Sequence, residues 1–525
     1  MIRKIAVKNI CIAICCFYGN SLQAQLNTGI IKTTVSQNLY FSITDSKQWK
    51  QIQSFYTANN FNPAWSNTEN IDNRNYLLNQ LKLSADIGLS EKDYLNTFIE
   101  TVRNGTVIWT TLADSVEAEI KITAAALHYY SDIAYGNTTP EITYKALVEM
   151  PECHDVPALL AQYINNKKLA SLGAYLTPAL QEIPVLENRI KWFAKLLSEN
   201  SFREATIISE TSTASNKLLV LKLYHLGFIK DTFNILQDSA VVRYIKEAQL
   251  QFGLVASGKL NHATLQQFNT TIYERLQELN YSINYYRWLS CYSQNKSVIV
   301  VNIPAAYLKV YNQQKVKLQM KVIVGKKSTP TPTLLSTVSE VVLYPYWHVP
   351  YSIATKEILP KLKRSAAIID AGNYQVLNRA GNITNPYSVN WKALSTKYFP
   401  YTIRQSTGCD NALGLLKLNF NSPAGVYLHD TPNKSFFGLN KRFLSHGCMR
   451  MENPTALGHL VLKNNSIAID TLTQKGCLLN QAPIFVKAID AMPVLVWYNP
   501  AGIDAAGNLL FFEDVYGKFK WNKKD

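Results

Sequence analysis

The spacing of apolar positions changes near residue 295, from a helical period to an alternating one. Before that point, stretches such as "QWKQIQSFYTANNFNPAW" and "LLNQLKLSADIGLSEKDYLNTFIETV" repeat apolar residues every three or four positions, which predicts helices. Pro63 and Gly88 stand where such helices would end. After it, "SVIVVNIPAAYLKVYN" and "KLQMKVIVG" alternate apolar and polar residues and are rich in Val and Ile, as strands are. We therefore expect a multidomain α+β protein, helical first and mostly β later.

A small three-helix module is expected between these two parts. In "VVRYIKEAQLQFGLVASGKLNHATLQQFN", residues 241–269, the pattern predicts a helix that ends at Gly253, a turn, and a second helix that opens at Thr264. The run resembles the peptidoglycan-binding module known from cell-wall proteins. Ser257 replaces the Asp that is usual in that module, so a purely structural role stays open.

The predicted domains follow these changes of pattern. A helical connector that ends in "YYRWLS" leads from the module into the β domain. The predicted boundaries are a leader at 1–24, a helical scaffold at 25–228, the module at 229–272, the connector at 273–294, the β domain at 295–490 and a C-terminal tail at 491–525.

One long connection interrupts the β domain. Strands are expected in "SEVVLYPYWHVP" and "ALGLLKLNF", and the stretch of about 352–412 between them starts helical and becomes polar and rich in Gly and Asn. So long a connection inside a β domain usually forms a lid. We expect a helical and loop capping insertion that covers a groove, without forming a separate domain.

The first 24 residues have the pattern of a secretory signal peptide. Three basic residues precede the short apolar run "ICIAICCFY", and Ala24 offers a small residue for cleavage. The run is too short to span a membrane. Leu22 stands where a small residue is usual, so an uncleaved leader that tethers the protein to the inner membrane stays open. The prediction is an exported, periplasmic protein.

The charge fits that compartment. The chain carries a net charge of +16, and removal of the three basic residues in the leader leaves +13. A moderately basic exported protein suits the anionic cell envelope. Nucleic acid is not an expected partner, because the chain has no arginine-rich run or recognition motif.

The cysteines do not form a disulfide framework. Five of the eight follow the leader, and they are widely scattered: Cys153, Cys291, Cys409, Cys448 and Cys477. Since five is odd, at least one thiol stays unpaired in any scheme within the chain. Cys448 draws attention because it lies in the polar run "SHGCMR".

Cys448 and His429 are the candidate nucleophile and base. Alternation in "AGVYLHDTP" places Tyr427 and His429 on one face of a strand, and a loop can return Cys448, nineteen residues later, to the strand end. An imidazole that takes the thiol proton leaves a thiolate able to attack a carbonyl. Amide N–H groups around Gly447 would face the oxyanion, and Arg450 would favour the thiolate.

Three other roles of Cys448 stay open at this point. In the first, the thiol would pair with Cys409 or Cys477 in a disulfide. In the second, it would ligate zinc together with His429 and His446, and in the third it would fill a core. No CxxC or HxxxH spacing supplies the remaining zinc ligands. A core position fits poorly with a polar loop.

His429, a loop and "SHGCMR" together resemble the signature of the L,D-transpeptidases, whose catalytic β domain is of the YkuD type. Asp430 replaces the Gly that usually follows the His. "YLHDTP" with this Asp resembles the large Gram-negative subtype, which also has a helical scaffold, a peptidoglycan-binding-like module and a capping insertion. Its "RWL", "VNIP" and "PYW.VP" runs occur here in the same order.

The resemblance implies a reaction on peptidoglycan stem peptides. Cys448 would attack the carbonyl between diaminopimelate and the terminal D-Ala of a donor stem, and His429 would be the base and then the acid. The amine of an acceptor stem would resolve the thioester as a 3→3 cross-link. No metal or cofactor is implied, and carbapenem-type β-lactams would acylate Cys448.

The resemblance also implies supporting roles and leaves alternatives. His446 would support the oxyanion site, and Trp347, Tyr427 and Ser445 would line the substrate groove. The same acyl-enzyme would serve an L,D-carboxypeptidase or a D-amino-acid exchange enzyme, because only the acceptor differs. A non-catalytic scaffold that binds the wall is the remaining alternative.

Overall fold

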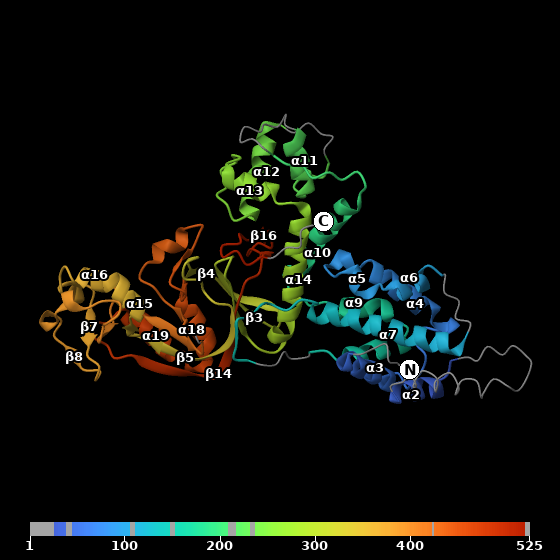
Figure 1. The fold of residues 1–525 in the computed structure, drawn as a ribbon, viewed down its shortest axis with the longest axis horizontal. Coiled ribbons are helices and arrows are strands. Elements are labelled where there is room, and N and C mark those ends of the chain that lie inside the picture. The colour runs from blue at the N-terminus through green and yellow to red at the C-terminus, as the bar shows by residue number, and fades with distance from the viewer. Residues whose placement is uncertain are drawn as a thin grey trace, which may run out of the picture. The chain divides into compact units, whose positions relative to one another are not determined.

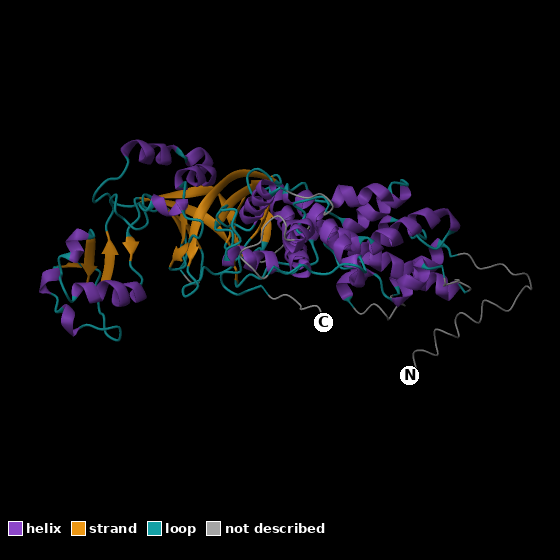
Figure 2. Cartoon of the chain, turned by 90° about the horizontal axis from the view of Figure 1, so that it is seen from above, coloured by secondary structure: helices purple, strands orange, loops and turns teal. Residues whose placement is uncertain are grey.

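The chain combines a helical first part with a later part rich in strands, as expected (Figures 1 and 2). The computed structural model describes residues 26–37, 45–105, 111–147, 153–207, 217–231, 237–422 and 425–519. The expected leader lies outside these residues. Within them, no helix combines the length and the apolar character that crossing a membrane requires.

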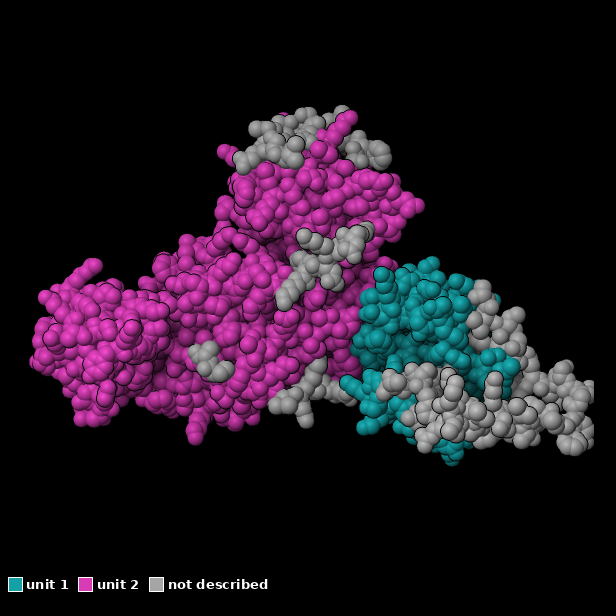
Figure 3. Space-filling model, viewed as in Figure 1, with its two compact units in different colours: residues 1–84, 90–133, 154–177 teal, residues 85–89, 134–153, 178–525 magenta. Residues whose placement is uncertain are grey.

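Two compact units make up the chain (Figure 3). Unit 1 consists of residues 1–84, 90–133 and 154–177, and unit 2 of residues 85–89, 134–153 and 178–525. Residues 178–228, which the sequence pattern grouped with the scaffold, therefore belong with the later part of the chain.

Unit 1 is built from amphipathic helices. They are α2 (Thr28–Ser36), α3 (Ser46–Ala58), α4 (Ile71–Lys82), α5 (Glu91–Tyr94), α6 (Thr97–Arg103), most of α7 (Leu112–Tyr135), α8 (Val156–Asn165) and α9 (Leu169–Leu176). Asp45, Asn96 and Asp155 cap α3, α6 and α8 by accepting hydrogen bonds from amides of the first turn. These caps and the apolar spacing explain why the helices could be predicted.

A buried carboxylate on α7 organises the loop after α3. Glu119 is fully buried and accepts hydrogen bonds from the amides of Ala64, of Trp65 at 3.1 Å and of Ser66 at 2.9 Å. The Tyr56 hydroxyl donates a further hydrogen bond at 3.1 Å. These donors satisfy carboxylate oxygens that would otherwise be left without partners in the interior.

Five helices open the long part of unit 2. They are α10 (Glu182–Ser198), α11 (Lys217–His225), α12 (Asp238–Gln251), α13 (His262–Asn269) and α14 (Ile272–Gln294). The helix, turn and helix predicted for 241–269 are confirmed, and Gly253 has a φ of +66° that favours glycine at the turn. A capping box of Thr271 and Glu274 starts α14, which coincides with the predicted connector.

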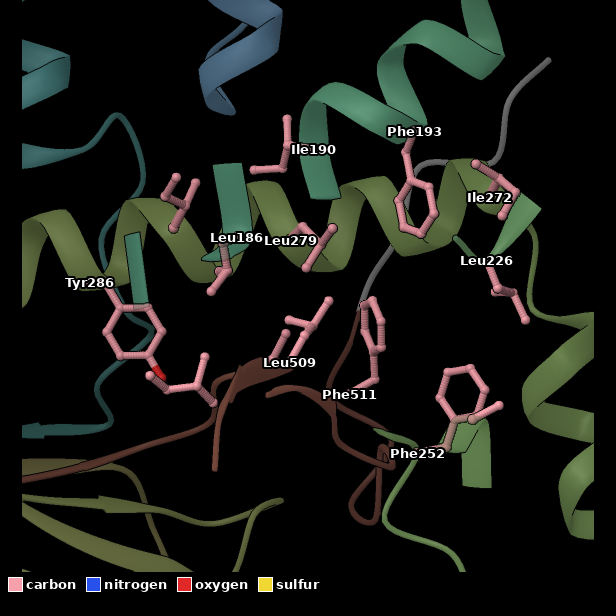
Figure 4. Packing of buried hydrophobic residues seen from close by; sticks show 14 of the residues in the cluster. Leu186, Ile190, Phe193, Leu226, Phe252, Ile272, Leu279, Tyr286, Leu509 and Phe511 are labelled. Carbon is pink, nitrogen blue, oxygen red and sulfur yellow. The ribbon is translucent and has the colours of Figure 1, made fainter. Parts of the chain in front are cut away.

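The core of these helices explains why 178–228 join unit 2. Leu186, Ile190 and Phe193 of α10 share one buried cluster with Leu279 of α14 (Figure 4). The C-terminal hairpin of β15 (Ala501–Ile503) and β16 (Leu509–Phe511) adds to the same cluster. Helix α10 lies within residues 178–228. Because its apolar face is buried against α14, this segment belongs to unit 2.

The predicted β domain is a closed sheet. In the described part of the chain its ring order is β5-β10-β11-β13-β4-β3-β2-β14, and β14 pairs again with β5. The strands are β2 (Val298–Asn302), β3 (Tyr307–Asn312), β4 (Lys315–Gly325), β5 (Leu334–Leu343), β10 (Leu416–Phe420), β11 (Leu428–His429), β13 (Met449–Met451) and β14 (Ile484–Trp497). β1 (Tyr144–Lys145) lies parallel to β5, and β12 (Phe443–Ser445) lies parallel to β4.

The expected boundary at residue 490 is misplaced, because β14 runs through it. Val494–Trp497 pair with β2 on one side, and Val494–Val496 pair with β5 on the other, so the first part of the expected tail belongs to the closed sheet. The helices α18 (Pro454–Leu462) and α19 (Ile467–Lys475) pack against the same domain, through a core that includes Leu457 and Ile469.

The capping insertion has a sheet and a core of its own. Its strands, β6 (Trp347–His348), β9 (Thr402–Gln405), β7 (Tyr374–Leu377) and β8 (Ile383–Thr384), form a small sheet apart from the larger one (Figure 2). Its helical turns are α15 (Tyr351–Ile353), the π-helical η3 (Ala354–Ile358), α16 (Leu359–Leu362) and α17 (Ile368–Ala371). Trp391, Phe399 and Ile403 supply a buried core in the segment expected to be a polar loop. The insertion is therefore a folded cap within unit 2.

Candidate active site

Two neighbouring strands bring the candidate residues to one face of the sheet. β11 and β13 pair in parallel, with His429 opposite Arg450 and Leu428 opposite Met449. Leu428 and Met449 are fully buried in the interior. Because side chains alternate along a strand, His429 and Arg450 point to the other face. The alternation predicted for "VYLHD" is thus the one observed.

Cys448 lies one position before this pairing, beside Tyr427. The Met449 amide donates to the Tyr427 carbonyl at 3.0 Å, which fixes the register at this point. Hydrogen bonds join the Tyr427 hydroxyl to the Cys448 sulfur and to the side chain of Trp347. Two aromatic residues expected in the groove are therefore brought to the candidate nucleophile.

A tight loop presents the thiol. The Ser445 hydroxyl donates to the Cys448 carbonyl at 2.5 Å and accepts from the Gly447 amide at 3.1 Å. Gly447 has a φ of +116°, which L side chains rarely adopt. Ser445, expected in the substrate groove, is buried and uses its hydroxyl within the loop. The Gly447 amide is likewise engaged, which leaves the Cys448 amide as the candidate oxyanion donor.

Cys448 is the free thiol among the cysteines that the structure describes. Cys153 pairs with Cys291, and Cys409 pairs with Cys477. The alternative of a disulfide between Cys448 and Cys409 or Cys477 is therefore wrong. Across the described residues, no group of three or more His, Cys, Asp or Glu side chains is placed to hold a metal ion.

Burial keeps the resting thiol protonated. It raises the pKa of Cys448, while hydrogen bonds from Tyr427 and the positive charges of Lys417 and Arg450 act in the opposite direction. Burial outweighs the charges of Lys417 and Arg450, so the pKa of the thiol is raised. Lys417 also lies over the Tyr427 ring, with its Nζ 4.0 Å from the ring centroid.

His429 is held as a neutral base. The residue is 4% exposed, and burial, followed by the charges of Arg450 and Lys417, lowers the pKa of its ring to about 3 against the hydrogen bond with Asp430. Nδ1 lies 2.5 Å from the Asp430 carbonyl oxygen. A carbonyl can only accept, so Nδ1 carries the proton and Nε2 keeps its lone pair. Among the described residues, no hydrogen bond joins this ring to the Cys448 sulfur.

His446 has a different environment from His429. Its side chain is 36% exposed, and Nε2 lies 2.8 Å from Oε1 of Glu357, in the π-helical turn of the cap. The cap therefore contacts the loop that carries Cys448. The sequence alone gave no reason to single out Glu357, because only the tertiary fold places it there.

The sequence reasoning missed Lys417, and it noted Asp430 without giving it a structural role. Lys417 lies opposite His429 on β10, and a lysine within the apolar run "LGLLKLNF" was the available signal. The Asp430 carboxylate accepts from the Leu415 amide at 2.9 Å and from Lys434 at 2.6 Å. Asp430 therefore holds the start of β10, a role that the glycine it replaces could not provide.

Comparisons with known proteins match both parts of the chain. Residues 296–469 match the YkuD family, described as an L,D-transpeptidase catalytic domain, and residues 50–182 match a family described as a scaffold domain. A curated protein of Haemophilus influenzae, named "Putative L,D-transpeptidase", is 38% identical over 220 residues. That match covers 42% of this chain and 44% of the relative, so it spans less than half of either protein.

Solved structures of L,D-transpeptidases are also similar to part of the chain. One from Stackebrandtia nassauensis is 14% identical, with a TM-score of 0.20, and covers 56% of this chain and 97% of that one. Another from Mycobacterium smegmatis is 14% identical, with a TM-score of 0.18, and covers 38% of this chain and 58% of that one. Residues 296–469 are assigned to the catalytic-domain family by the family match.

Proposed function

We propose that this chain, whose residues 296–469 form an L,D-transpeptidase catalytic domain, joins peptidoglycan stem peptides through a thioester on Cys448. The observation that carries the proposal is the position of this free, half-buried thiol. It shares one sheet face with His429 and Arg450, and its sulfur is hydrogen-bonded to Tyr427. A buried disulfide or a structural thiol would need none of these neighbours.

The first step forms the acyl-enzyme. The Cys448 sulfur attacks the carbonyl between diaminopimelate and the terminal D-Ala, and its proton passes to Nε2 of His429. Since burial raises the pKa of the thiol and that of His429 is lowered to about 3, the resting pair is neutral. The proton therefore moves during the attack. The Cys448 amide stabilises the oxyanion, and the Tyr427 hydroxyl stabilises the sulfur as charge develops.

The second step releases D-Ala, and the third forms the cross-link. His429 returns the proton to the amine of D-Ala, the C–N bond breaks and the thioester remains. The side-chain amine of a second diaminopimelate then attacks the thioester, so that a C–N bond forms, the C–S bond breaks and a 3→3 cross-link results. The donor and acceptor stems are the partners, in the periplasm at the wall, with an inner-membrane tether if the leader is retained.

The acyl-enzyme needs protection from water, because a thioester open to solvent would hydrolyse, and the cap is the element that could provide it. Trp347 opens the cap and its ring is hydrogen-bonded to Tyr427, which places the start of the cap beside Cys448. The disulfide of Cys409 and Cys477 fastens the end of the cap to the segment after α19. We infer that the cap excludes water from the acyl-enzyme and covers the donor groove.

Mass analysis of muropeptides tests the function. The purified protein is incubated with wall material rich in tetrapeptide stems, beside a Cys448→Ser variant. The expected products are 3→3 dimers and free D-Ala, and neither should form with the variant. Tripeptides without dimers would identify a carboxypeptidase, and incorporation of an added D-amino acid would identify an exchange enzyme. Unchanged muropeptides would overturn the proposal, and a non-catalytic scaffold that binds the wall would be the remaining alternative.

A further inference from the structure

The two histidines of the candidate site have opposite surroundings. His429 is buried and has the cations Lys417 and Arg450 as neighbours. His446 is partly exposed, two residues before Cys448, and is paired with the carboxylate of Glu357. A positively charged group therefore meets two cations next to His429 and a carboxylate next to His446.

The carboxylate is presented by a fixed backbone. Glu357 lies in the π-helical turn Ala354–Ile358, whose terminal residues are buried in the core of the cap. The Thr355 hydroxyl donates to the Tyr351 carbonyl at 2.8 Å and braces the turn. Widened turns of this kind are rare within helices and are frequent at functional sites. The pair of Glu357 and His446 thus has a rigid support on the side of the cap.

The histidine has an equally rigid support. The Ser445 carbonyl accepts from the Lys326 amide at 3.0 Å and from the Thr329 hydroxyl at 3.2 Å. On the other side of His446, the Gly447 carbonyl accepts from the Thr331 hydroxyl at 2.8 Å. The ring is therefore held by Glu357 of the cap and by the hydrogen-bonded backbone on both sides of His446, two residues before Cys448.

We propose that His446 is the base on the acceptor side of the transfer and that Glu357 is its positioning residue. The inference deepens the proposed function and rests on it. The Glu357 carboxylate accepts from Nε2–H, which leaves the lone pair on Nδ1 for the incoming amine. This is the arrangement by which a carboxylate orients a catalytic imidazole in nucleophile–base systems generally.

The acceptor needs such a base. A primary alkyl amine has a pKa of about 10.4, so it arrives at neutral pH as an ammonium ion, which cannot attack. The ammonium gives one proton to Nδ1 of His446, and the free amine forms a C–N bond with the thioester carbonyl. The C–S bond then breaks, and the second amine proton goes to the Cys448 sulfur and restores the thiol. His446 releases its proton to solvent.

His429 is poorly suited to this second task. Its pKa of about 3 makes it a weak base for an ammonium ion, and Lys417 and Arg450 disfavour a cation at that side. Glu357 attracts the ammonium and orients the base that deprotonates it. The structure thus assigns donor chemistry to His429 and acceptor chemistry to the pair of His446 and Glu357.

The test separates the two half-reactions. Glu357→Gln keeps the size of the side chain, and Asp370→Asn is the matched control, because Asp370 is a carboxylate of the same cap that hydrogen-bonds Tyr387. Release of D-Ala in a single turnover measures acylation. Transfer is then measured to a stem-peptide amine and to hydroxylamine, which is largely unprotonated at neutral pH and needs no base to attack.

Glu357→Gln is expected to leave acylation within about twofold and to slow transfer to the stem amine by about tenfold or more, within the range of general base assistance. Transfer to hydroxylamine should change little, and Asp370→Asn should resemble wild type in all three assays. Equal slowing with both nucleophiles, or transfer to the stem amine within about twofold of wild type, would overturn the inference. A wild-type protein that releases no D-Ala would instead refute the proposed function, and this inference with it.

Discussion

The buried carboxylate of unit 1 and the buried histidine of unit 2 are both titratable groups removed from water, but their neighbours differ. Glu119 receives hydrogen bonds from successive backbone amides and from Tyr56. Within the described part of the chain, the His429 ring has one hydrogen bond, to the Asp430 carbonyl, and it lies near two positive charges. Burial is common to both, so burial alone does not mark a catalytic group.

The two groups differ in whether a lone pair is still available for a ligand or a proton. The donors around Glu119 come from Tyr56 of α3 and from the loop that follows this helix, so the carboxylate acts as a structural anchor. In His429 the hydrogen bond at Nδ1 and the nearby cations keep the ring neutral and leave the lone pair of Nε2 for a proton. A group that is buried, oriented and still reactive is what catalysis requires.

Removing the imidazole should have the largest effect on activity. His429→Ala is expected to slow acylation by about 10²–10⁴-fold, because general base assistance is lost. Release of D-Ala in a single turnover measures this, with circular dichroism to check that the fold is kept. A loss smaller than about tenfold would move the base role to His446 and would erase the contrast with Glu119.

Removing the hydroxyl beside the sulfur should have a smaller effect. Tyr427→Phe deletes the hydrogen bond to Cys448 and keeps the ring under Lys417, so acylation should slow by about tenfold. Tyr311→Phe is the matched control, since Tyr311 is a buried tyrosine of the same domain that hydrogen-bonds Glu182 at 2.7 Å. If both variants acylate at the same rate, Tyr427 has no special role at the sulfur.

Removing the anchor should change stability but not chemistry. Glu119→Ala leaves buried amides of the loop without an acceptor, which should lower the free energy of unfolding by about 1–3 kcal/mol. Glu117→Ala, on the same helix, removes an exposed carboxylate that pairs with Lys121 and should change it by less than about 1 kcal/mol. Urea titrations measure both values. An acylation rate altered by Glu119→Ala at a temperature where the protein is folded would contradict this division.

The two groups should also affect stability in opposite directions as the pH changes. The pKa of His429 is lowered to about 3 in the folded protein, so protons favour the unfolded state and its stabilising contribution is lost as pH falls from about 6.5 towards 3. Burial raises the pKa of Glu119, so its stabilising contribution is lost as pH rises through the folded-state pKa. Urea titrations across this pH range compare the wild type with His429→Gln and with Glu119→Gln. The difference in the free energy of unfolding between wild type and variant should change with pH in opposite directions for the two variants. Slopes of the same sign would show that one of the two environments is misjudged.

Much of the candidate site follows from local sequence patterns. The alternation around His429 predicts its strand face, and the glycine at 447 provides the positive φ that the loop needs. Such features depend on a few consecutive residues. The approach of Glu357 to His446 and of Lys417 to His429 depends on pairings between distant segments, which no local pattern encodes.

Some features of the fold escaped prediction for similar physical reasons. The strands of the cap have two to four residues, too few for an alternating pattern to stand out. The scaffold boundary at 228 was misplaced because α10 has an ordinary amphipathic pattern that does not say which neighbour its apolar face will meet. The pairing of four cysteines likewise depends on the folded chain.

Intact-protein mass spectrometry after incubation with a carbapenem-type β-lactam tests the central claim, that Cys448 carries the acyl group, most directly. The strained amide of such a compound imitates the acyl donor, and attack by the thiol should add one inhibitor mass to the protein. The Cys448→Ser variant should remain unmodified under the same conditions, because a serine hydroxyl is a much weaker nucleophile than a thiolate. A single adduct on the wild type and none on the variant is the predicted result, and an adduct that persists on the variant would contradict the account.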